Sequence, residues 1–390
     1  MVSGVICEFN PFHNGHKYLL GSARRNSSKV ICVMSGNFTQ RGEIALYEKH
    51  VRAEMALKNG ADLVISLPVG WSMSGAENFA FGGISLLNST GIVERLVFGC
   101  ENNNLDLLKQ TASLLNDNSV LDSIKKNADT GITFAKAREN AIAQISPPCA
   151  DILTKPNNIL AVQYLLSAEN IGFKGEFLPV CRVGAEHDSK ETSNNFSSAS
   201  NIREHILKND FECVLNLVPS NIINTLKSAP HTDFSLLDKA VLFKLRALTL
   251  DDIKNLPDIS EGIENRIFEN IKSATCFEEL LSNIKTKRYT MARIRRILMC
   301  AAFGIDNSYI KKKPPYIKIL GYNDTGKEML TDISKNSDIP LIINSKDTDK
   351  LDDFGKKVFE SEMLSTDLFS LAYTTPLNCG TELTIPIVKI

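Results

Sequence analysis

The sequence predicts an α/β protein, in which an N-terminal parallel sheet is followed by a mainly helical region and a small α/β tail. Three observations support this prediction. In the first half, short and continuously apolar runs alternate with amphipathic helical segments, as in parallel sheets covered on both faces. From about residue 209 to 304 the patterns are helical, and strand-like runs return after residue 314. The composition, 43% hydrophobic and 23% charged in 390 residues, excludes a disordered, collagen-like or disulfide-stapled chain.

The elements of the predicted sheet follow in order from the N-terminus. We expect strands at residues 2–7, 30–34, 63–67, 95–98 and 176–180, and helices at residues 15–25, 48–59 and 77–87. Gly60 ends the second helix as a C-cap glycine does, and Pro68 ends the third strand. Because ligands of parallel sheets bind at the carboxyl ends of the strands, we expect a site in the loops that follow these strands.

We place a domain boundary at residue 208, just after a helix that begins in the sequence F-S-S-A-S-N-I-R. The first predicted domain is 1–208. The second predicted region is 209–390, which is helical to about residue 305 and ends in a small α/β tail at 314–390. Within this tail we expect strands at 316–320 and 340–343 and a helix near 326–334.

Charge and cysteine usage indicate the compartment and limit the possible partners. The chain has 44 Lys and Arg against 45 Asp and Glu, so any nucleic-acid binding must come from a local patch. Its nine cysteines are scattered and never spaced C-x-x-C, which is typical of free thiols in a reducing cytosol. No run approaches the ~20 apolar residues of a membrane helix, and Glu8 and Asn10 stand where a signal peptide would be apolar. We therefore expect a cytoplasmic protein with no membrane association.

The strongest motif is F-N-P-F-H-N-G-H, residues 9–16, directly after the first strand. Pro11 stiffens the turn, Gly15 lets the backbone approach a ligand, and His16 opens a helix whose N-terminus favours anions. The imidazoles of His13 and His16 then point into one pocket, where they can counter charge that develops on a phosphoryl group. The alternatives are a metal pair or a structural turn. A third metal ligand is not evident, so no metal site is predicted.

This motif and several further blocks resemble the HIGH-motif nucleotidyltransferases, and more narrowly the tRNA(Met) cytidine acetate ligases. The blocks stand in the same order and run from residue 2 to about residue 300: G-V-I-C-E-F-N-P-F-H-N-G-H, V-M-S-G-N-F-T-Q-R-G-E, G-A-D-L-V-I, V-F-G-C-E, K-P-N-N-I-L, S-S-A-S-N-I-R and K-T-K-R-Y-T. The sequence departs from the family at Phe9 and Glu186, where Tyr is usual. The second departure puts the nucleotide contacts of that loop in question.

The resemblance implies a Rossmann-like nucleotidyltransferase sheet in an ATP-dependent ligase. Acetate, the co-substrate, would attack the α-phosphorus of ATP, which is normally presented as Mg-ATP, to give acetyl-adenylate and pyrophosphate. The wobble cytidine of elongator tRNA(Met) would then take the acetyl group on N4. Residues 1–208 would be the ATP-binding catalytic domain and residues 209–390 the tRNA-binding region, and no obligate protein partner is evident.

The resemblance also implies the residues of the ATP site, with His13 and His16 as the catalytic pair. They comprise the loop and helix start after the first strand and four later positions: Ile6, Cys7, Glu8, Phe9, Asn10, Pro11, Phe12, His13, Asn14, Gly15, His16, Lys17, Tyr18, Leu19, Gly99, Asn157, Arg182 and Val183. Taken singly, Gly99, Asn157 and Arg182 are better explained as a turn glycine, a helix cap and a surface arginine, and only the ordered set of motifs favours the nucleotide site.

A second phosphate-binding candidate is the helix start that contains Ser198, Ser200 and Arg203. Hydroxyl groups and free N–H groups at a helix start, with an arginine one turn later, suit a pyrophosphate leaving group. The alternative is an ordinary serine N-cap, which accounts for one serine and leaves the arginine unexplained.

The candidate RNA-binding segment is 285–313, which holds nine Lys or Arg and one acid, Asp306. Within it we select five residues for contact with a tRNA backbone: Lys285, Lys287, Arg288, Arg293 and Arg296. The alternative is a solvated basic face. On a helix from about Met291, the apolar stripe would leave the arginines outside the core.

Two other functions remain open at this point. The first is an adenylyltransferase of a cofactor pathway that acts on a phosphorylated metabolite, and the second is a nucleotide-binding RNA chaperone. A metabolite enzyme needs neither the long helical region nor the basic segment. A chaperone does not require both His13 and His16.

Overall fold

An eight-stranded sheet forms the centre of the computed structural model, which describes residues 1–25, 27–128, 132–182, 196–260 and 262–390. Its strand order is β5-β4-β1-β2-β3-β6-β7, and β8 also pairs with β6. The strands are β1 (Val2–Cys7), β2 (Lys29–Ser35), β3 (Leu63–Leu67), β4 (Arg95–Cys100), β5 (Glu176–Cys181), β6 (Ile317–Tyr322), β7 (Leu341–Ile342) and β8 (Val388–Lys389). The first five strands are mutually parallel, which confirms the predicted sheet.

The sheet has a switch point next to its first strand. Strand β1 pairs with β2 on one side and with β4 on the other, so the chain first builds outward from β1 in one direction and later in the other. The connections that leave the carboxyl ends of β1 and β4 therefore diverge. Such a point is where ligands of open parallel sheets bind.

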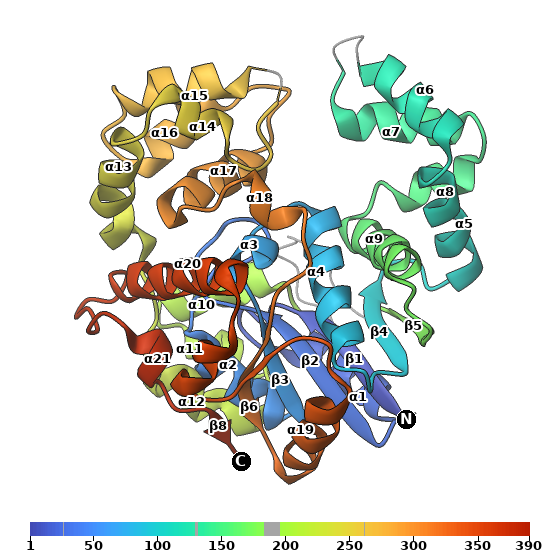
Figure 1. Cartoon of the computed structure of the whole chain (residues 1–390), viewed down its shortest axis with the longest axis vertical. Helices are drawn as coiled ribbons and strands as arrows, with labels where there is room; N and C mark the ends of the chain where they lie inside the picture. Colours follow the sequence, from blue (N-terminus) through green and yellow to red (C-terminus); the bar gives the residue numbers. More distant parts are fainter. Residues whose placement is uncertain (26, 129–131, 183–195, 261) are drawn as a thin grey trace.

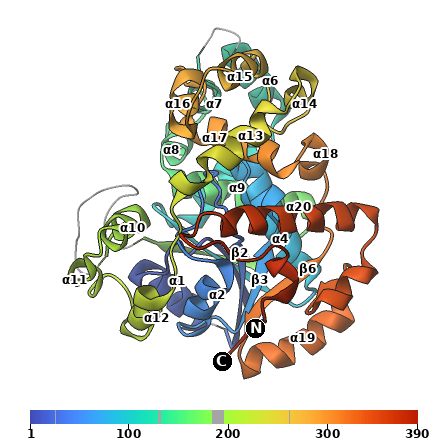
Figure 2. The same cartoon turned by 90° about the vertical axis from the view of Figure 1, so that its left-hand side faces the viewer.

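Helices cover both faces of this sheet, because successive strand residues point into two separate cores (Figures 1 and 2). Val5 and Cys32 pack with helices α1 (Asn14–Arg25) and α2 (Lys49–Leu57). Their neighbours Ile6 and Val33 pack on the opposite face, with helices α4 (Ala76–Ser89) and α9 (Pro156–Ile171). Continuously apolar strands are required by this arrangement, as the sequence predicted. The short helix α3 (Val69–Ser72) follows β3.

Two helical lobes stand at the end of the sheet away from the N-terminus in Figure 1. The first lobe is an insertion between β4 and α9 that sequence analysis did not single out, and it has its own core around Val120, Ile124 and Ile142. It consists of α5 (Leu105–Leu115), α6 (Asn118–Ala128), α7 (Phe134–Ala143) and α8 (Pro147–Ile152).

The second lobe comes from the predicted helical region. It consists of α13 (Asp238–Arg246), α14 (Leu250–Lys254), α15 (Ile263–Ile271), α16 (Phe277–Ile284), α17 (Met291–Phe303) and α18 (Asn307–Ile310). Helix α17 begins where it was predicted and ends at Gly304, which adopts the left-handed conformation of a helix cap. In the chain, five short elements connect β5 to this lobe: α10 (Ala199–Leu207), α11 (Phe211–Val214), η1 (Ser220–Ile222), α12 (Ile223–Ser228) and η2 (Phe234–Leu237). The buried residues of α10, α11, η1 and α12 pack on the same face of the sheet as α1 and α2.

The C-terminal tail completes the N-terminal sheet, which the sequence did not predict. Strand β6 pairs antiparallel with β3 and covers the backbone N–H and C=O groups of an edge that would otherwise be open. The tail also contains α19 (Asp324–Asn336), η3 (Ser345–Lys350), α20 (Asp353–Ser370) and α21 (Thr381–Thr384). The sheet thus takes strands from both sides of residue 208. The domain boundary proposed at this residue stays a prediction.

A buried charge network attaches this tail to the sheet. The Lys49 ammonium lies 2.9 Å from a carboxylate oxygen of Glu362 and 2.6 Å from one of Glu382, and all three side chains are fully buried. Lys318 also pairs with Glu382, which balances two cations against two anions. These carboxylates hold the pKa of Lys49 above its usual range, against the effect of its burial.

The cysteines and the apolar segments of the helices can be described directly. All nine cysteines are free thiols, and Cys181, Cys213 and Cys379 are exposed. Among the described residues, no helix combines the length and the apolar character needed to cross a membrane.

Candidate active site

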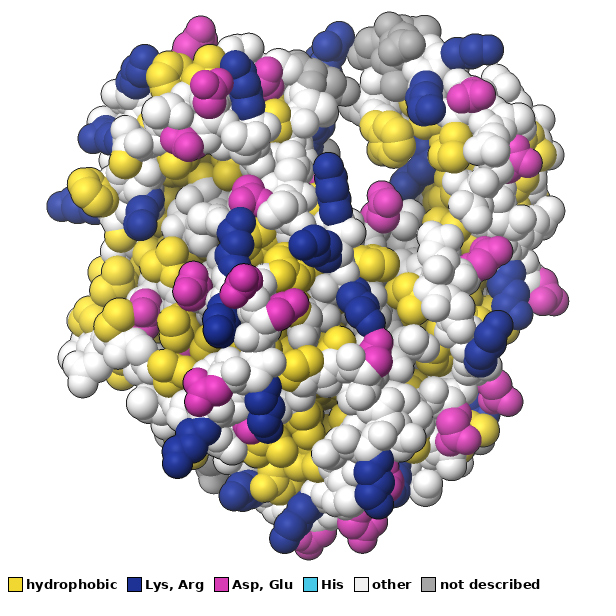
Figure 3. Space-filling model, viewed as in Figure 1, with side chains coloured by type: hydrophobic (Ala, Val, Ile, Leu, Met, Phe, Trp, Pro, Cys, Tyr) yellow, Lys and Arg dark blue, Asp and Glu magenta, His cyan; other side chains and the backbone are white. Residues whose placement is uncertain are grey.

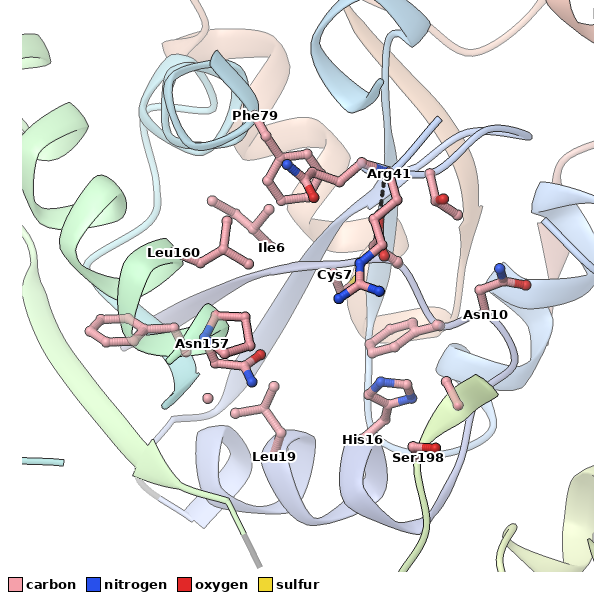
Figure 4. Close-up of a pocket in the computed structure, with 18 of the residues that line it drawn as sticks. Ile6, Cys7, Asn10, His16, Leu19, Arg41, Phe79, Asn157, Leu160 and Ser198 are labelled. Atoms are coloured by element: carbon pink, nitrogen blue, oxygen red, sulfur yellow. Dashed lines mark hydrogen bonds between the residues drawn. The ribbon is translucent and has the colours of Figure 1, made fainter. Parts of the chain in front are cut away.

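A cavity of about 370 Å³ opens at the carboxyl ends of β1 and β4, next to the switch point of the sheet (Figure 4). Residues from the predicted ATP site and the predicted phosphate site line it together: Ile6, Cys7, Glu8, Phe9, Asn10, His13, His16, Leu19, Gly99, Asn157, Arg182, Ser198, Ser200 and Arg203. They come from β1, the start of α1, β4, α9, β5 and α10, so the fold gathers segments that are about 190 residues apart in sequence.

The two histidines form a stacked pair on the cavity wall. Their ring centroids lie 3.7 Å apart with the planes 25° from parallel. The Nδ1 atom of His13 accepts the backbone N–H of Gly15 at 3.0 Å, and the Nδ1 atom of His16 accepts the N–H of His13 at 3.3 Å. A ring nitrogen that accepts a hydrogen bond carries no proton, so each neutral ring keeps its proton on Nε2.

Both imidazoles are neutral at neutral pH. Burial, with a smaller contribution from the charge of Arg182, lowers the pKa of His13 to about 3. Burial also lowers the pKa of His16 well below its usual value, and the charges of His13 and Arg182 add to this effect. The expectation that the pair counters phosphoryl charge therefore takes a specific form: two neutral Nε2–H groups that donate hydrogen bonds.

The turn that carries the histidines has little freedom. Phe9 is fully buried, has a φ of 49°, and packs its ring against Phe12 and His16 at centroid distances of 4.9 and 4.8 Å. A Cβ at position 15 would lie 2.8 Å from the His13 ring, so only glycine fits there. The packed aromatic rings and the close approach at Gly15 hold both imidazoles in place.

Four residues of the predicted motif line neither this cavity nor the smaller one beside it, and for two of them the reason is the periodicity of α1. His13, His16 and Leu19 recur every three residues and share one face of the start of α1. Asn14 and Lys17 turn away from that face, and Asn14 donates to the carbonyl oxygen of Asn216 at 2.8 Å. The cavity lining likewise does not include Pro11 and Phe12, whereas Gly15 and Tyr18 line a smaller adjoining cavity of about 60 Å³. The predicted Val183, like Glu186, lies outside the described residues.

On the β4 side, Glu101 organises the nucleotide-binding candidates. Its carboxylate accepts the side-chain amide of Asn157 at 2.6 Å and the backbone N–H of Asn158 at 2.8 Å. The guanidinium of Arg182 donates to the Asn157 Oδ1 at 3.3 Å. Sequence analysis quoted Glu101 within a motif but assigned it no role. At Gly99 an added Cβ would meet only the Arg182 side chain at 3.9 Å, so the space above this glycine is open to a ligand.

The start of α10 confirms the N-cap interpretation of its first serine, whereas phosphate binding there stays a prediction. Ser198 is the N-cap, because its hydroxyl accepts the backbone N–H of Asn201 at 3.2 Å, and it lies 3.1 Å from the Ser200 hydroxyl. Both serines nevertheless line the cavity together with Arg203. Arg203 donates to the carbonyl oxygen of Asn10 at 2.8 Å, which ties α10 to the turn before the histidines.

The loop at residues 35–43 supplies cavity residues that were not selected individually from the sequence. They are Thr39, Gln40, Arg41 and Glu43. Figure 4 shows the Arg41 side chain directed into the cavity, toward His16 and Cys7. The backbone N–H of Gln40 donates to the Glu8 carboxylate at 2.6 Å, and burial raises the pKa of Glu8. The loop is therefore attached directly to the end of β1.

A buried arginine fixes the same loop to the sheet. Arg52 is completely buried and donates to the carbonyl oxygens of Glu8, Ser35 and Gly36, at the ends of β1 and β2. Burial lowers its pKa to about 10, so it remains charged at neutral pH. One guanidinium thus holds the two backbone segments that border the cavity.

The five predicted tRNA-binding residues fall into two groups. Lys285, Lys287 and Arg288 are exposed on the segment before α17. Arg293 and Arg296 are used within the protein: Arg293 donates to the carbonyl oxygen of Asp258 at 2.9 Å, and Arg296 lies 3.2 Å from the Asp258 carboxylate. Asp258 has a φ of 61°, so both arginines hold a strained turn.

Away from the cavity, one group of side chains among the residues described has metal-ligand chemistry. Ligand atoms of His205, Asp210 and Cys213 lie within 4.8 Å of one another. The Asp210 carboxylate already accepts from the backbone N–H of Cys213, in the first turn of α11, and contacts His205 at 2.8 Å. A helix cap therefore accounts for this group.

The switch-point cavity, the histidine pair at a helix start and the converging arginines define a nucleotide-binding α/β protein with HIGH-type chemistry. A sequence model of the HIGH Nucleotidyl Transferase family matches residues 1–381, and the chain belongs to this family. Over 403 residues it is 38% identical to the tRNA(Met) cytidine acetate ligase of Thermoanaerobacter sp. (strain X514), with 100% of both chains covered. It is 37% identical to the enzyme of the same name from Clostridium novyi (strain NT), with 90% of this chain and 92% of the relative covered.

Solved structures agree with this assignment. The chain superposes on the crystal structure of apo Thermotoga maritima TmcAL (form I) with a TM-score of 0.93 and 30% identity. For TmcAL bound with α-thio ATP (form II) the TM-score is 0.90, again at 30% identity. Both comparisons cover 100% of this chain and 99% of the other.

Proposed function

We propose that this protein is an ATP-dependent ligase that activates acetate as acetyl-adenylate and transfers the acetyl group to N4 of the wobble cytidine of elongator tRNA(Met). The observation that carries the proposal is the cavity at the switch point, where the His13–His16 pair, the start of α10 and three arginines converge. The full-length relatives named tRNA(Met) cytidine acetate ligase support the choice of substrates. The Thermotoga structure with α-thio ATP supports ATP as the nucleotide.

The nucleotide has a defined orientation in this proposal. Gly99, Asn157 and Arg182 border the open β4 side, where an amide and a flat guanidinium suit the base and ribose. The Nε2–H groups of His13 and His16 donate to the α-phosphate. Ser198, Ser200 and Arg203, at the N-terminus of α10, bind the pyrophosphate. ATP enters as Mg-ATP, its usual form.

We place acetate beside Arg41. Its guanidinium enters the cavity from the loop that faces His16, and a guanidinium pairs with a carboxylate through two parallel hydrogen bonds. In the first step an acetate oxygen bonds to the α-phosphorus and pyrophosphate leaves. In the second step the cytidine N4 bonds to the acetyl carbon, the carbon–oxygen bond to AMP breaks, and N4 releases one proton.

Space for RNA lies above the cavity. Figure 3 shows an open hollow between the lobe of α5–α8 and the lobe of α13–α18, with Lys and Arg side chains along its borders. Exposed Lys285, Lys287 and Arg288 belong to the second lobe, and they can neutralise phosphates. We propose that these three residues form the main tRNA contact, and that Arg293 and Arg296 stabilise the lobe.

The experiment that tests this function uses the purified protein with ATP, acetate and a tRNA(Met) transcript. We expect N4-acetylcytidine in the nucleosides of the product, detected by mass spectrometry, and only when ATP and acetate are both present. A transcript with uridine at the wobble position is the matched control and should stay unmodified. Absence of N4-acetylcytidine from the complete reaction would refute the proposal.

A further inference from the structure

The loop at residues 35–43 touches both the cavity and helix α17. On the cavity side, Gln40 donates its backbone N–H to Glu8. On the other side, Gly42 lies against the backbone of α17: a Cβ at this position would sit 2.9 Å from the Arg296 nitrogen and 3.1 Å from the Arg295 carbonyl carbon. With a φ of 74°, Gly42 also has a conformation that other residues rarely adopt. The loop therefore needs glycine at position 42 for its close contact with the backbone of α17.

The next residue forms a charged bridge across this contact. One oxygen of the Glu43 carboxylate lies 3.1 Å from the Arg295 guanidinium on α17, and the other lies 3.5 Å from the Arg203 guanidinium on α10. Arg203 in turn donates to the carbonyl oxygen of Asn10, in the turn before His13. A continuous chain of polar contacts thus runs from α17 to the catalytic turn.

This bridge is not needed to hold α17 against the loop at residues 35–43. Helix α17 buries Ile294, Ile297 and Leu298 completely, and Phe303 packs on Phe38 with ring centroids 4.7 Å apart. The Glu43 side chain keeps 35% of its surface exposed, and ion pairs of this kind contribute little to stability. Glu43 therefore refines the position of a helix whose attachment comes from apolar packing.

We infer that Glu43 is a positioning residue for acetyl transfer. It fixes the position of α17, and so of the tRNA bound by the second lobe, relative to the ATP cavity. The inference rests on the proposed function. Transfer depends on the relative position of the tRNA and the acetyl-adenylate, because a misplacement of about 1 Å at the reacting atoms can cost ~10²-fold in rate. Acetate activation needs no RNA and so depends far less on the position of α17 relative to the cavity.

The test compares Glu43→Gln, which removes the charge and keeps the shape, with Glu54→Gln as the control. Glu54 pairs with Lys58 one turn along α2, and its side chain is 33% exposed, close to the value for Glu43. Two rates are measured: acetate-dependent ATP–pyrophosphate exchange without tRNA, and N4-acetylcytidine formation at varied tRNA concentrations.

For Glu43→Gln we expect kcat of transfer to fall at least tenfold more than the exchange rate, with the KM for tRNA unchanged or lower. The KM does not rise because the substitution removes a negative charge near a polyanion. Glu54→Gln should match the wild type in both assays. Equal losses in transfer and exchange, unchanged transfer, or a raised KM with unchanged kcat would each overturn the inference.

A double-mutant cycle tests whether the bridge is the cause. Arg295→Met should reproduce the selective loss in transfer, and Glu43→Gln combined with Arg295→Met should be no slower than the slower single variant. Multiplied losses in the double variant would show that the two residues act independently and would overturn the inference. If the wild-type protein performs neither exchange nor transfer, the proposed function fails instead, which the same assays reveal.

Discussion

The substitution His16→Ala removes one of the two neutral donors that we propose to bind the α-phosphate. Its Nε2–H is preorganised, because the Nδ1 atom accepts the backbone N–H of His13 and the ring stacks on the other imidazole. Losing one such donor costs ~10²–10³-fold in rate, or about 2.7–4 kcal/mol of transition-state stabilisation. The His13 donor and the start of α10 remain, so we do not expect a complete loss. Acetate-dependent ATP–pyrophosphate exchange measures the effect.

The pH dependence of the same assay separates a neutral donor from a cationic one. Burial holds the pKa of both histidines well below neutrality, so the free enzyme has neutral imidazoles from pH 6 to pH 8. Since kcat/KM reports ionisations of the free enzyme, it should show no fall with rising pH near 6.5. A wild-type kcat/KM that declines above pH 6.5, with this decline lost in His16→Ala, would refute the neutral-donor mechanism. So would exchange by His16→Ala within threefold of the wild type.

Three further predictions concern stability, acetate and RNA. The pKa of His13 is near 6.5 in the unfolded chain and about 3 in the folded protein, so the free energy of unfolding decreases as the pH falls below 6.5. Between pH 7 and pH 5, urea denaturation should show that the free energy of unfolding decreases by about 2 kcal/mol less for His13→Asn than for the wild type. Arg41→Met should raise the KM for acetate about tenfold or more in the exchange assay, with a smaller change for ATP; an unchanged acetate KM would place acetate elsewhere. Changing Lys285, Lys287 and Arg288 to Gln should make the plot of log tRNA affinity against log salt concentration shallower by about three phosphate contacts, and should leave ATP–pyrophosphate exchange unchanged. An unchanged slope of this plot would exclude the segment as a tRNA-binding site.

The sheet was predictable because its signal is local. The strands β1 to β4 are continuously apolar, each is followed by a turn or loop, and their observed bounds lie within a few residues of the expected ones. The turn that carries the histidines was also predictable, since His13 and His16 sit three residues apart at a helix start. Their protonation was not, because it depends on burial by residues distant in sequence.

What the sequence could not reveal depends on long-range partners. Arg293 and Arg296 were selected for RNA because they carry charge off an apolar stripe, yet their partner Asp258 lies 35 and 38 residues away. Periodicity along one helix gives no indication of such a partner. The Glu43–Arg295 contact spans 252 residues, and the pairing of β6 with β3 joins segments equally remote. Only the folded structure brings these groups together.

The most direct test of the mechanism follows the oxygen atoms of acetate. With acetate labelled by ¹⁸O in both positions, attack on the α-phosphorus leaves one labelled oxygen in AMP and the other in the acetyl group of the modified cytidine. Mass spectrometry of both products after a single turnover measures this distribution. The account predicts one ¹⁸O atom in AMP and one in N4-acetylcytidine. Unlabelled AMP, or label in phosphate or pyrophosphate, would contradict activation of acetate as acetyl-adenylate in this cavity.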